Sequence, residues 1–491
     1  MRRGGIARDA LIVALIKIAA SALVLATGFR AVSDDDFARV VLAEAWAHAP
    51  RLDPSGTSWL PFPFWLQGTV HAIAGRSLDV ARATSLVLGV VSALVVYLAA
   101  RWITRDARAA LAGAVLAAIF PWSARLGVAT VPELPTAALT LLALASLAPR
   151  DDARPLASRR LVGALALLAA TLSRYEPWPI AAGFALLSLA DARRAVTVDR
   201  PRLVAAAALA ITGPAAWIAW NHRAHGEALH FLTRVAAYKK ALGAGTDESA
   251  LTRLLAYPIA LVREEPEVFT ALAVLVALAW ITRLPALRTR LARFARPLLL
   301  ALAQIAALSL AMVKDGAPTH HPERAVLVAM LLAALIAGDL VAALLASPAS
   351  LRARVAAVAS TAAAVIVAAL IIRPRITADE TFTPRAHEVA IGRAARAHAA
   401  PGERVLVEVV DYGHLAIVAA LGRPEDAVLD RSIDPRDARV ASSFDAVPAL
   451  LARREQSGAS WAIGRPSLVT RQAFRDPLQI EGEWALFAAR P

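Results

Sequence analysis

Three consecutive aspartates, Asp34, Asp35 and Asp36, follow the first long apolar stretch of the chain, in the segment ATGFRAVSDDDFARVV. A carboxylate at a membrane surface could take a proton from a substrate as a general base. Neighbouring carboxylates could also hold a divalent cation through oxygen ligands. The alternative is a solvated loop in which an aspartate caps the following helix, because Asp is common at helix starts.

Further charged residues lie at the ends of apolar segments, where an unpaired charge is costly and therefore marks a candidate site. Glu133 enters an apolar run in VPELPTA, and Arg174, Tyr175 and Glu176 follow another in LSRYEPWP. Arg174 could stabilise negative charge that develops on a substrate. The alternative is that Arg174 and Glu176 only neutralise each other as an ion pair.

A cationic segment, KDGAPTHHPERAVLV, precedes a late apolar run. Arginine binds phosphate through two parallel hydrogen bonds, so this cluster suits an anion. The adjacent histidines lack the i, i+4 spacing of a helical zinc site, which argues against a metal there. The alternative is that the arginine only anchors a helix at the interface. The candidates in this segment are Lys314, His320, His321, Glu323 and Arg324.

A second basic stretch, VAAYKKALGAGTDES, contains Tyr238, Lys239 and Lys240 before a glycine-containing tail. These residues could contact a substrate or belong to a loop that closes over the site, since the tail favours flexibility. A solvated basic turn is the simpler interpretation, because short charge runs usually are solvated.

The elements that position these residues must lie in a membrane. The 491 residues are 58% hydrophobic with a mean hydropathy of +0.54, above the usual apolar share of a soluble domain. Long runs of Ala, Leu and Val separated by arginine clusters predict an α-helical polytopic membrane protein with about 11 transmembrane helices. The expected spans are residues 10–30, 80–103, 108–122, 133–149, 160–174, 177–190, 203–220, 266–283, 297–313, 325–346 and 354–372.

Arginine-rich loops alternate with longer and more acidic ones, and the arginine-rich loops are cytoplasmic by the positive-inside rule. The N-terminus, with Arg2, Arg3 and Arg8, is therefore expected in the cytoplasm. The acid triplet and the other candidates then share the outer face. The aromatic segment WLPFPFWLQGTVHAIAG, from Trp59, suits an interfacial helix in the headgroup layer.

Residues 373–491 have a different character from the membrane domain expected over 1–372. Helical patterning and the β-like run RVLVEVV predict a soluble α/β domain. This domain is expected on the outer side of the membrane, which in a bacterial cell is the periplasm. The formal net charge of +14 is spread between the apolar runs, which argues against nucleic-acid binding. The chain has no cysteine, so disulfide and thiolate chemistry are excluded.

The order of these motifs on a common face resembles the GT-C glycosyltransferases, in particular the protein O-mannosyltransferase and aminoarabinose-transferase relatives grouped as family 39. That family carries an acidic pair in the first outer loop, matched by Asp34 and Asp35 or by Asp35 and Asp36. The segment from Trp59 to Arg82, the RYE sequence and THHPERAVL are similar to further segments of the family. Here the acidic site reads Asp-Asp-Asp rather than the Asp-Glu of the O-mannosyltransferases, which leaves open which carboxylate is the base.

The resemblance implies an integral membrane enzyme that transfers a sugar, with inversion, from a polyprenyl-phosphate donor to a lipid, glycan or protein acceptor on the outer face. Asp35 would be the general base because it belongs to either alignment, with Asp34 and Asp36 as further catalytic candidates. The donor phosphate would be bound by Arg174, Lys314, His321 and Arg324. Substrate contacts would come from Glu133, Tyr175, Glu176, Tyr238, Lys239, His320 and Glu323.

No cofactor is expected, and a divalent cation held by the carboxylates is the less favoured alternative. The expected location is a bacterial-type inner membrane, with several spans, membrane lipids and the donor as partners and no nucleic acid. The leading alternative function is a lipid or solute transporter, whose charged residues would line a path. The chain shows no internal repeat, and its ionisable residues cluster at one surface, which favours the enzyme. A third alternative is a membrane-anchored assembly protein whose C-terminal domain is the working part.

Overall fold

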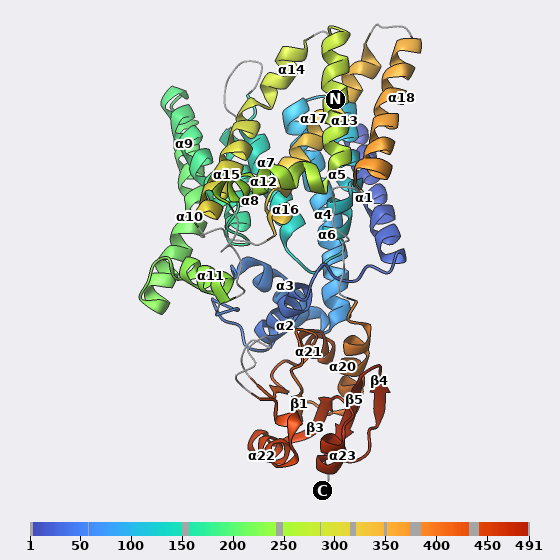
Figure 1. The fold of residues 1–491 in the computed structure, drawn as a ribbon. Helices are drawn as coiled ribbons and strands as arrows, with labels where there is room; N and C mark the ends of the chain where they lie inside the picture. The colour runs from blue at the N-terminus through green and yellow to red at the C-terminus, as the bar shows by residue number, and fades with distance from the viewer. Residues whose placement is uncertain are drawn as a thin grey trace.

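The computed structural model describes residues 3–56, 58–149, 157–241, 249–284, 286–314, 321–347, 351–373, 384–431 and 441–489. A bundle of α-helices forms most of the molecule, and a smaller domain with a β-sheet lies at the end that carries the C-terminus (Figure 1). The N-terminus lies at the opposite end of the bundle (Figure 1). This is the α-helical architecture with a C-terminal α/β domain that the sequence predicted.

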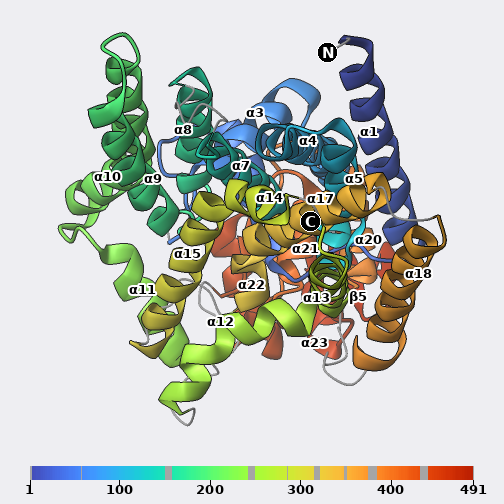
Figure 2. The same ribbon diagram turned by 90° about the horizontal axis from the view of Figure 1, so that it is seen from above.

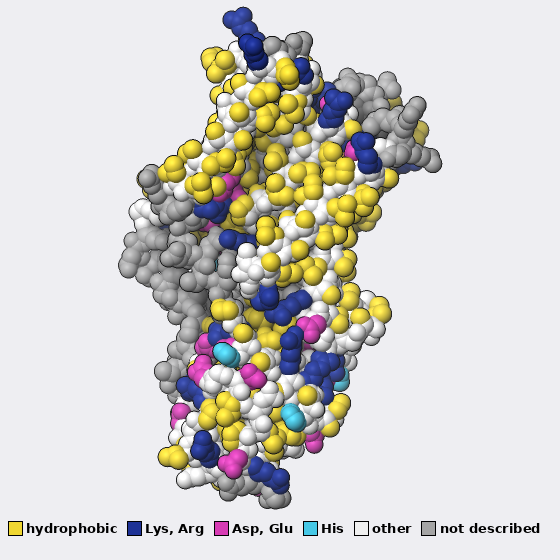
Figure 3. All heavy atoms as spheres, turned by 90° about the vertical axis from the view of Figure 1, so that its right-hand side faces the viewer, with side chains coloured by type: hydrophobic (Ala, Val, Ile, Leu, Met, Phe, Trp, Pro, Cys, Tyr) yellow, Lys and Arg dark blue, Asp and Glu magenta, His cyan; other side chains and the backbone are white. Residues whose placement is uncertain are grey.

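Each segment expected to span the membrane contains a helix, because an apolar chain in lipid must satisfy its backbone hydrogen bonds internally. By length and composition, six of the described helices could cross a membrane: α1, α4, α10, α15, α17, and α18 with its extension η1. The exact number of spans stays a prediction. Hydrophobic side chains cover the bundle in a broad belt, and charged side chains gather below it (Figure 3). The bundle helices are α1 (Arg3–Ala26), α4 (Leu78–Thr104), α5 (Ala107–Ile119), α7 (Glu133–Ser146), α8 (Ala157–Thr171), α9 (Trp178–Arg194), α10 (Arg200–His225), α13 (Pro266–Ile281), α15 (Ala295–Val313), α17 (Leu327–Ala346), α18 (Leu351–Val367) and η1 (Ala368–Ile372).

Shorter helices connect the bundle helices. Two of them, α2 and α3, lie between the bundle and the C-terminal domain, and α3 forms from the aromatic segment predicted to be helical (Figure 1). Their position brings the residues after α1 to the junction of the two domains. The connecting helices are α2 (Asp35–His48), α3 (Phe62–Ala74), α6 (Pro121–Leu126), α11 (His230–Ala241), α12 (Ala250–Glu264), α14 (Leu287–Arg293) and α16 (Pro322–Ala325).

Helix α17 lies near the centre of the bundle (Figure 2), and most of its residues are buried against α5, α7, α13 and α15. Its closest approach is to α5, where Gly338 meets Gly113. A Cβ atom built on Gly338 would lie only 2.3 Å from the Cα of Gly113. Small residues at such a crossing let two helix backbones touch, which is how helices pack in a membrane without a hydrophobic driving force between them.

The C-terminal domain contains a five-stranded sheet in the order β2-β1-β3-β5-β4. Strand β1 is parallel to both β2 and β3, with Val405 opposite Ala427 and Trp461. Strand β5 is antiparallel to β3 and β4. The elements are α20 (Ala386–His398), β1 (Arg404–Val407), α21 (His414–Leu421), β2 (Ala427–Leu429), η2 (Ser443–Asp445), α22 (Val447–Ser457), β3 (Ala459–Gly464), α23 (Leu468–Ala473), β4 (Gln479–Glu481) and β5 (Trp484–Ala488).

Both faces of this sheet are covered. Val405 and Val407 of β1 belong to a core with residues of α20 and α21, whereas Leu406 belongs to a core with residues of α22 and α23. This alternation follows from the two-residue period of a strand. The run of apolar residues in β1 is therefore explained by burial on both faces.

An apolar core also joins the C-terminal domain to the elements beneath the bundle. Phe37 and Val40 of α2 and Leu78 of α4 pack with Val389 of α20 and Ala416 of α21. The C-terminal domain is therefore docked on the helix that begins with the acid triplet, because that helix buries apolar side chains against both α20 and α21.

Substituting Gly338 by alanine should destabilise the bundle, because the new methyl group would overlap the backbone of α5. Overpacking of this kind typically costs about 1–3 kcal/mol. We expect a lower midpoint of thermal unfolding for G338A in detergent. The matched control is G5A, since a Cβ on Gly5 meets no atom within 4 Å. Equal unfolding midpoints for G338A and the wild type would contradict the close crossing.

Candidate active site

The carboxylate of Asp36 is buried where α2 meets the bundle. One oxygen accepts hydrogen bonds from the backbone N–H groups of Val32 at 3.1 Å and Ser33 at 3.2 Å. The other accepts from the N–H of Thr130 at 2.9 Å, and the Thr130 hydroxyl donates to the Asp36 carbonyl. Burial raises the pKa of Asp36 to about 6, although these hydrogen bonds favour the charged form. Asp36 therefore fastens α2 to the bundle.

Asp34 faces the C-terminal domain. Both of its oxygens accept hydrogen bonds from the guanidinium of Arg385, each at 3.0 Å. Asp34 is the residue before α2, yet its side chain makes no capping hydrogen bond to the helix. The helix-capping role considered from the sequence is thus replaced by a contact between domains.

Asp35 is the most open of the three aspartates, with 42% of its side chain exposed. It lies in the first turn of α2, where the helix dipole favours a carboxylate. One oxygen lies 4.0 Å from Nη1 of Arg324. Asp35 is therefore the carboxylate of the triplet that a substrate can reach.

Arg174, in the loop between α8 and α9, is enclosed by two glutamates. Its Nη1 donates to Oε1 of Glu133 at 2.6 Å, and its Nε donates to both oxygens of Glu176, at 3.0 and 3.1 Å. Both glutamates are buried. The ion pair considered from the sequence is present, and Glu133 at the start of α7 extends it. These carboxylates occupy hydrogen-bond donors of Arg174, which thereby links Glu133 to Glu176.

Arg324, in α16, is buried between Asp35 and Glu133 but makes weak contacts. Its Nη1 lies 4.0 Å from Asp35 and 3.9 Å from Glu133, and its Nη2 donates to the hydroxyl of Ser33 at 3.4 Å. Within the described residues its Nε makes no hydrogen bond and lies 3.8 Å from Glu323. Most of the hydrogen-bonding capacity of this guanidinium is therefore available to a ligand.

His321 and Glu323 flank Arg324 at the start of α16. Nδ1 of His321 lies 3.2 Å from Oε1 of Glu323. Within this segment, Arg324 is the residue that contacts Asp35, and Glu323 joins it to His321.

Arg39, which sequence reasoning did not select, lies on α2 one turn after Asp35. It is 7% exposed, and its guanidinium carbon lies 4.4 Å from the ring centre of Trp59 and 5.9 Å from that of Phe64. In the described part of the chain its buried Nε has no hydrogen-bond acceptor. Cation–π contacts offset part of the cost of this burial. The i, i+4 spacing from Asp35 is the signal that could have revealed it, because residues so spaced share a helix face.

A cavity of about 20 Å³ lies behind Glu133 and Arg324. Gln304 of α15 anchors α16 by donating from Nε2 to the carbonyl of Ala325 at 3.2 Å. Among the described residues, the Oε1 of Gln304 and the hydroxyl of Thr136 have no hydrogen-bond partner. A polar cavity of this size can hold about one water molecule, which would join these groups to Glu133.

Tyr175, a predicted substrate contact, is directed to a group of aromatic residues instead of to Asp35. Its ring stacks on Phe231 with a centroid distance of 4.7 Å, and its hydroxyl donates to the carbonyl of Ser58 at 2.6 Å. The Trp217 indole N–H donates to the same hydroxyl at 3.0 Å. Tyr175 therefore joins α10, α11 and the segment before α3.

The remaining sequence candidates are not joined to the cluster by contacts of the described residues. Lys314 is exposed at the end of α15. Tyr238 and Lys239 belong to α11, so their backbone is helical where the sequence predicted a loop. Their side chains, and the whole of His320, lie outside the described part of the chain.

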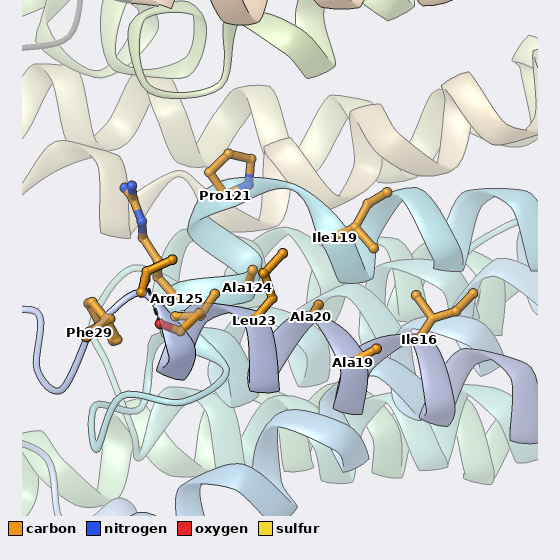
Figure 4. A pocket seen from close by; sticks show the side chains of 12 residues that line it. Ile16, Ala19, Ala20, Leu23, Phe29, Ile119, Pro121, Ala124 and Arg125 are labelled. Carbon is orange, nitrogen blue, oxygen red and sulfur yellow. Dashed lines mark hydrogen bonds between the residues drawn. The ribbon is translucent and has the colours of Figure 1, made fainter.

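An apolar groove of about 830 Å³ runs along α1 beside α5 and α6. Ile16, Ala20 and Leu23 follow one another along α1, and Phe29 and Arg125 lie together at the end away from Ile16 (Figure 4). The chain continues from this end to α2. The groove is therefore a hydrophobic surface that leads toward the acid triplet and suits a lipid chain.

No group of three or more His, Asp or Glu side chains that could hold a metal ion occurs among the described residues. Asp34 binds Arg385 and Asp36 binds backbone amides, so the triplet does not form a shared cage of oxygen atoms. That the protein needs no divalent cation stays a prediction.

Residues 54–220 match the protein family described as dolichyl-phosphate-mannose-protein mannosyltransferase. This region contains Trp59, Glu133, Arg174 and Glu176, and it ends well before Arg324. No curated protein sequence matches the chain significantly.

Solved structures share the fold over nearly the whole chain. ArnT from Cupriavidus metallidurans bound to undecaprenyl phosphate is 15% identical, with a TM-score of 0.58, covering 99% of this chain and 98% of that one. The archaeal oligosaccharyltransferase AglB from Archaeoglobus fulgidus, in complex with an inhibitory peptide and a dolichol-phosphate, is 14% identical, with a TM-score of 0.51, covering 94% of this chain and 69% of that one. The chain therefore has the GT-C fold, as the sequence resemblance predicted.

Ionisation of Asp36 should weaken the folded state. Its pKa is about 6 in the folded chain against an ordinary value of 3.8, so the folded chain binds this proton more tightly than the unfolded one. The stabilisation is complete below about pH 4 and is lost as the pH rises through about 6. A shift of about two pKa units corresponds to about 3 kcal/mol.

Thermal unfolding in detergent, followed from about pH 4 to pH 7, measures this effect. The unfolding midpoint of the wild type should fall more steeply over this window than that of D36N, which lacks the titrating group. D36N keeps every other ionisable group of the chain, so the difference between the two curves reports on Asp36. Parallel curves for the two proteins would contradict the assignment.

Proposed function

We propose that the protein is an integral membrane glycosyltransferase that transfers a sugar from a polyprenyl-phosphate donor to a lipid, glycan or protein acceptor at the outer face of the membrane. One observation carries the proposal. The exposed carboxylate of Asp35 lies beside Arg324 and one turn from Arg39, two buried guanidinium groups whose hydrogen bonds are incomplete. A base next to guanidinium groups with incomplete hydrogen bonds suits a reaction in which a hydroxyl or amine attacks and a phosphate leaves.

In this reaction Asp35 takes the proton of the acceptor hydroxyl or amine as that group attacks the anomeric carbon. The bond from this carbon to the donor phosphate oxygen breaks, and its electron pair remains on the phosphate. Attack from the side opposite the phosphate inverts the anomeric carbon. The proton on Asp35 and the charge on the phosphate then leave with solvent and lipid product.

Arg324 and Arg39 are assigned to the developing charge on the phosphate, because they have hydrogen-bonding capacity to offer. His321 and Lys314 remain candidates for the same role at the edge of the site. Arg174 acts on the phosphate only through its charge, since its donors are occupied by Glu133 and Glu176. Glu133 holds Arg324 near Asp35, and Glu323 and Glu176 complete the network.

The lipid part of the donor needs an apolar surface next to the site. The groove along α1 supports this part of the proposal, because it leads toward α2 and is lined mainly by apolar residues. The family that matches residues 54–220 is named for a dolichyl-phosphate sugar donor, and ArnT was solved with undecaprenyl phosphate. Both are polyprenyl phosphates, which supports the donor class.

The proposal keeps the orientation expected from the sequence. The N-terminus is cytoplasmic, the membrane domain comprises residues 1–372, and residues 373–491 form a periplasmic domain in a bacterial-type inner membrane. The position of the C-terminal domain supports this, because it lies at the same end of the bundle as the acid triplet (Figure 1).

Replacing Asp35 by asparagine should lower kcat by about a hundredfold or more, because general-base catalysis typically contributes that factor. Transfer of labelled hexose from a panel of polyprenyl-phosphate donors by purified protein in lipid nanodiscs measures it, with and without a chelator. D79N is the matched control, since Asp79 is an exposed carboxylate that pairs with Arg393 at the edge of the domain interface. No turnover by the wild type with any donor would favour the transporter alternative. Full activity of D35N would refute the base assignment.

Replacing Arg39 by glutamine should lower kcat/KM for the donor by roughly ten- to a hundredfold, because a charged hydrogen bond is worth about 1.5–3 kcal/mol. The loss should be smaller for a donor analogue without the phosphate charge. R30Q is the control, since Arg30 is exposed and, among the described residues, donates to the carbonyls of Leu25 and Phe29. Equal effects of R39Q and R30Q would show that Arg39 is not a phosphate ligand.

A further inference from the structure

Arg385, at the start of the C-terminal domain, binds three carboxylates at once. Its Nε and Nη2 donate to the two oxygens of Asp34, each at 3.0 Å, and its Nη1 donates to Glu388 at 3.0 Å and to Asp411 at 2.8 Å. The Arg385 side chain is only 15% exposed. Two parallel hydrogen bonds between arginine and a carboxylate fix relative orientation as well as distance.

The C-terminal domain holds this guanidinium rigidly from its own side. Glu388 lies one turn further along α20, and Asp411 lies in the turn between β1 and α21. Oδ1 of Asp411 accepts from the N–H of Gly413, and the Asp411 carbonyl contacts Nδ1 of His414 at 2.7 Å. The direction of Arg385 is therefore set by α20 and by the carboxyl end of β1.

The first turn of α2 is thus held from two sides. The bundle binds Asp36 through Thr130, and the C-terminal domain binds Asp34 through Arg385. Asp35 lies between these two fixed neighbours in the sequence. The Asp36 contact sets the rotation of this turn, and the Asp34 contact keeps the helix end from fraying, so both support the direction of Asp35 toward Arg324.

Two other ion pairs between the domains involve residues outside α2. Arg393 pairs with Asp79 at 2.6 Å, and both side chains are at least half exposed. Arg76 pairs with Glu425 at 2.7 Å. The chain therefore supplies an internal comparison, because removing one of these pairs changes the interface without releasing Asp34.

We propose that Arg385 is a positioning residue of the transferase, through which the C-terminal domain orients Asp35 for proton transfer. This inference rests on the proposed function, and it gives the C-terminal domain a direct part in the reaction. Arg385 acts through Asp34 and the backbone of α2, without touching the reacting atoms. The soluble domain is then a component of the active site and not a separate binding module.

The experiment compares full-length R385Q and R393Q with the wild type in nanodiscs. Hydrogen exchange of residues 33–41, read by mass spectrometry, reports the order of the α2 start without requiring any turnover. We expect exchange of this segment to be at least tenfold faster in R385Q and unchanged in R393Q. Similar exchange in all three proteins would overturn the proposal, whatever the enzyme activity shows.

Kinetics give the second readout. R385Q should lower kcat at least tenfold and change the donor KM much less, because Arg324 lies in α16 and not on α2, so it keeps its place. A merely structural role would instead lower the unfolding midpoint of R385Q and R393Q alike and leave the kcat of folded protein unchanged. That result would overturn the proposal while leaving the proposed function intact. Absence of turnover by the wild type would count against the proposed function alone.

A double substitution tests the pathway of the effect. In D34N the pair of parallel hydrogen bonds between Arg385 and residue 34 is weakened. Adding R385Q should therefore lower kcat little further. Losses that multiply in the double variant would show that Arg385 and Asp34 act independently, and would overturn the proposal.

Discussion

The hydrogen bonds from the backbone to the carboxylate of Asp36 determine how the acid triplet is used. A buried carboxylate must be bound, so these bonds fix the rotation of the first turn of α2 against the bundle. Successive residues of a helix are turned by about 100 degrees from one another. Once Asp36 points to Thr130, Asp34 and Asp35 must point in other directions. Three identical side chains therefore have three environments: the C-terminal domain, the open site and the protein interior.

The buried arginines of the bundle and of α2 differ in how completely they are hydrogen-bonded. This difference suggests where an anionic ligand could bind. Arg160, at the other end of the bundle, donates to Asp191 at 2.8 Å and to Ser188 at 3.0 Å, as expected for a buried arginine. Arg39 and Arg324 lie at similar depth with incomplete hydrogen bonds. A buried guanidinium whose hydrogen bonds are incomplete is unfavourable unless a ligand completes the set. The cluster is thus suited to an anion that arrives with the substrate.

Hydropathy predicted the bundle helices, because each depends on a local run of apolar residues. The separate surroundings of Asp34, Asp35 and Asp36 could not be predicted, since their partners Arg385 and Thr130 lie far along the chain. The same reason explains Tyr175, whose neighbour in sequence, Arg174, joins the charge network while its own ring faces the aromatic cluster. Arg39 was within reach of the helical spacing, but its missing hydrogen bonds depend on tertiary packing around Trp59.

The interface between the domains has a consequence for biogenesis. Asp34 is synthesised near the start of the chain, and Arg385 is 351 residues further on. By the proposed orientation, the ribosome must complete the bundle, and the last part of the chain must cross the membrane and fold, before the two can meet. A nascent or truncated chain would carry every residue of the bundle and still lack the contact that holds Asp34. Catalytic competence would then be acquired only at the end of export, which would keep partly inserted molecules from consuming lipid-linked sugar.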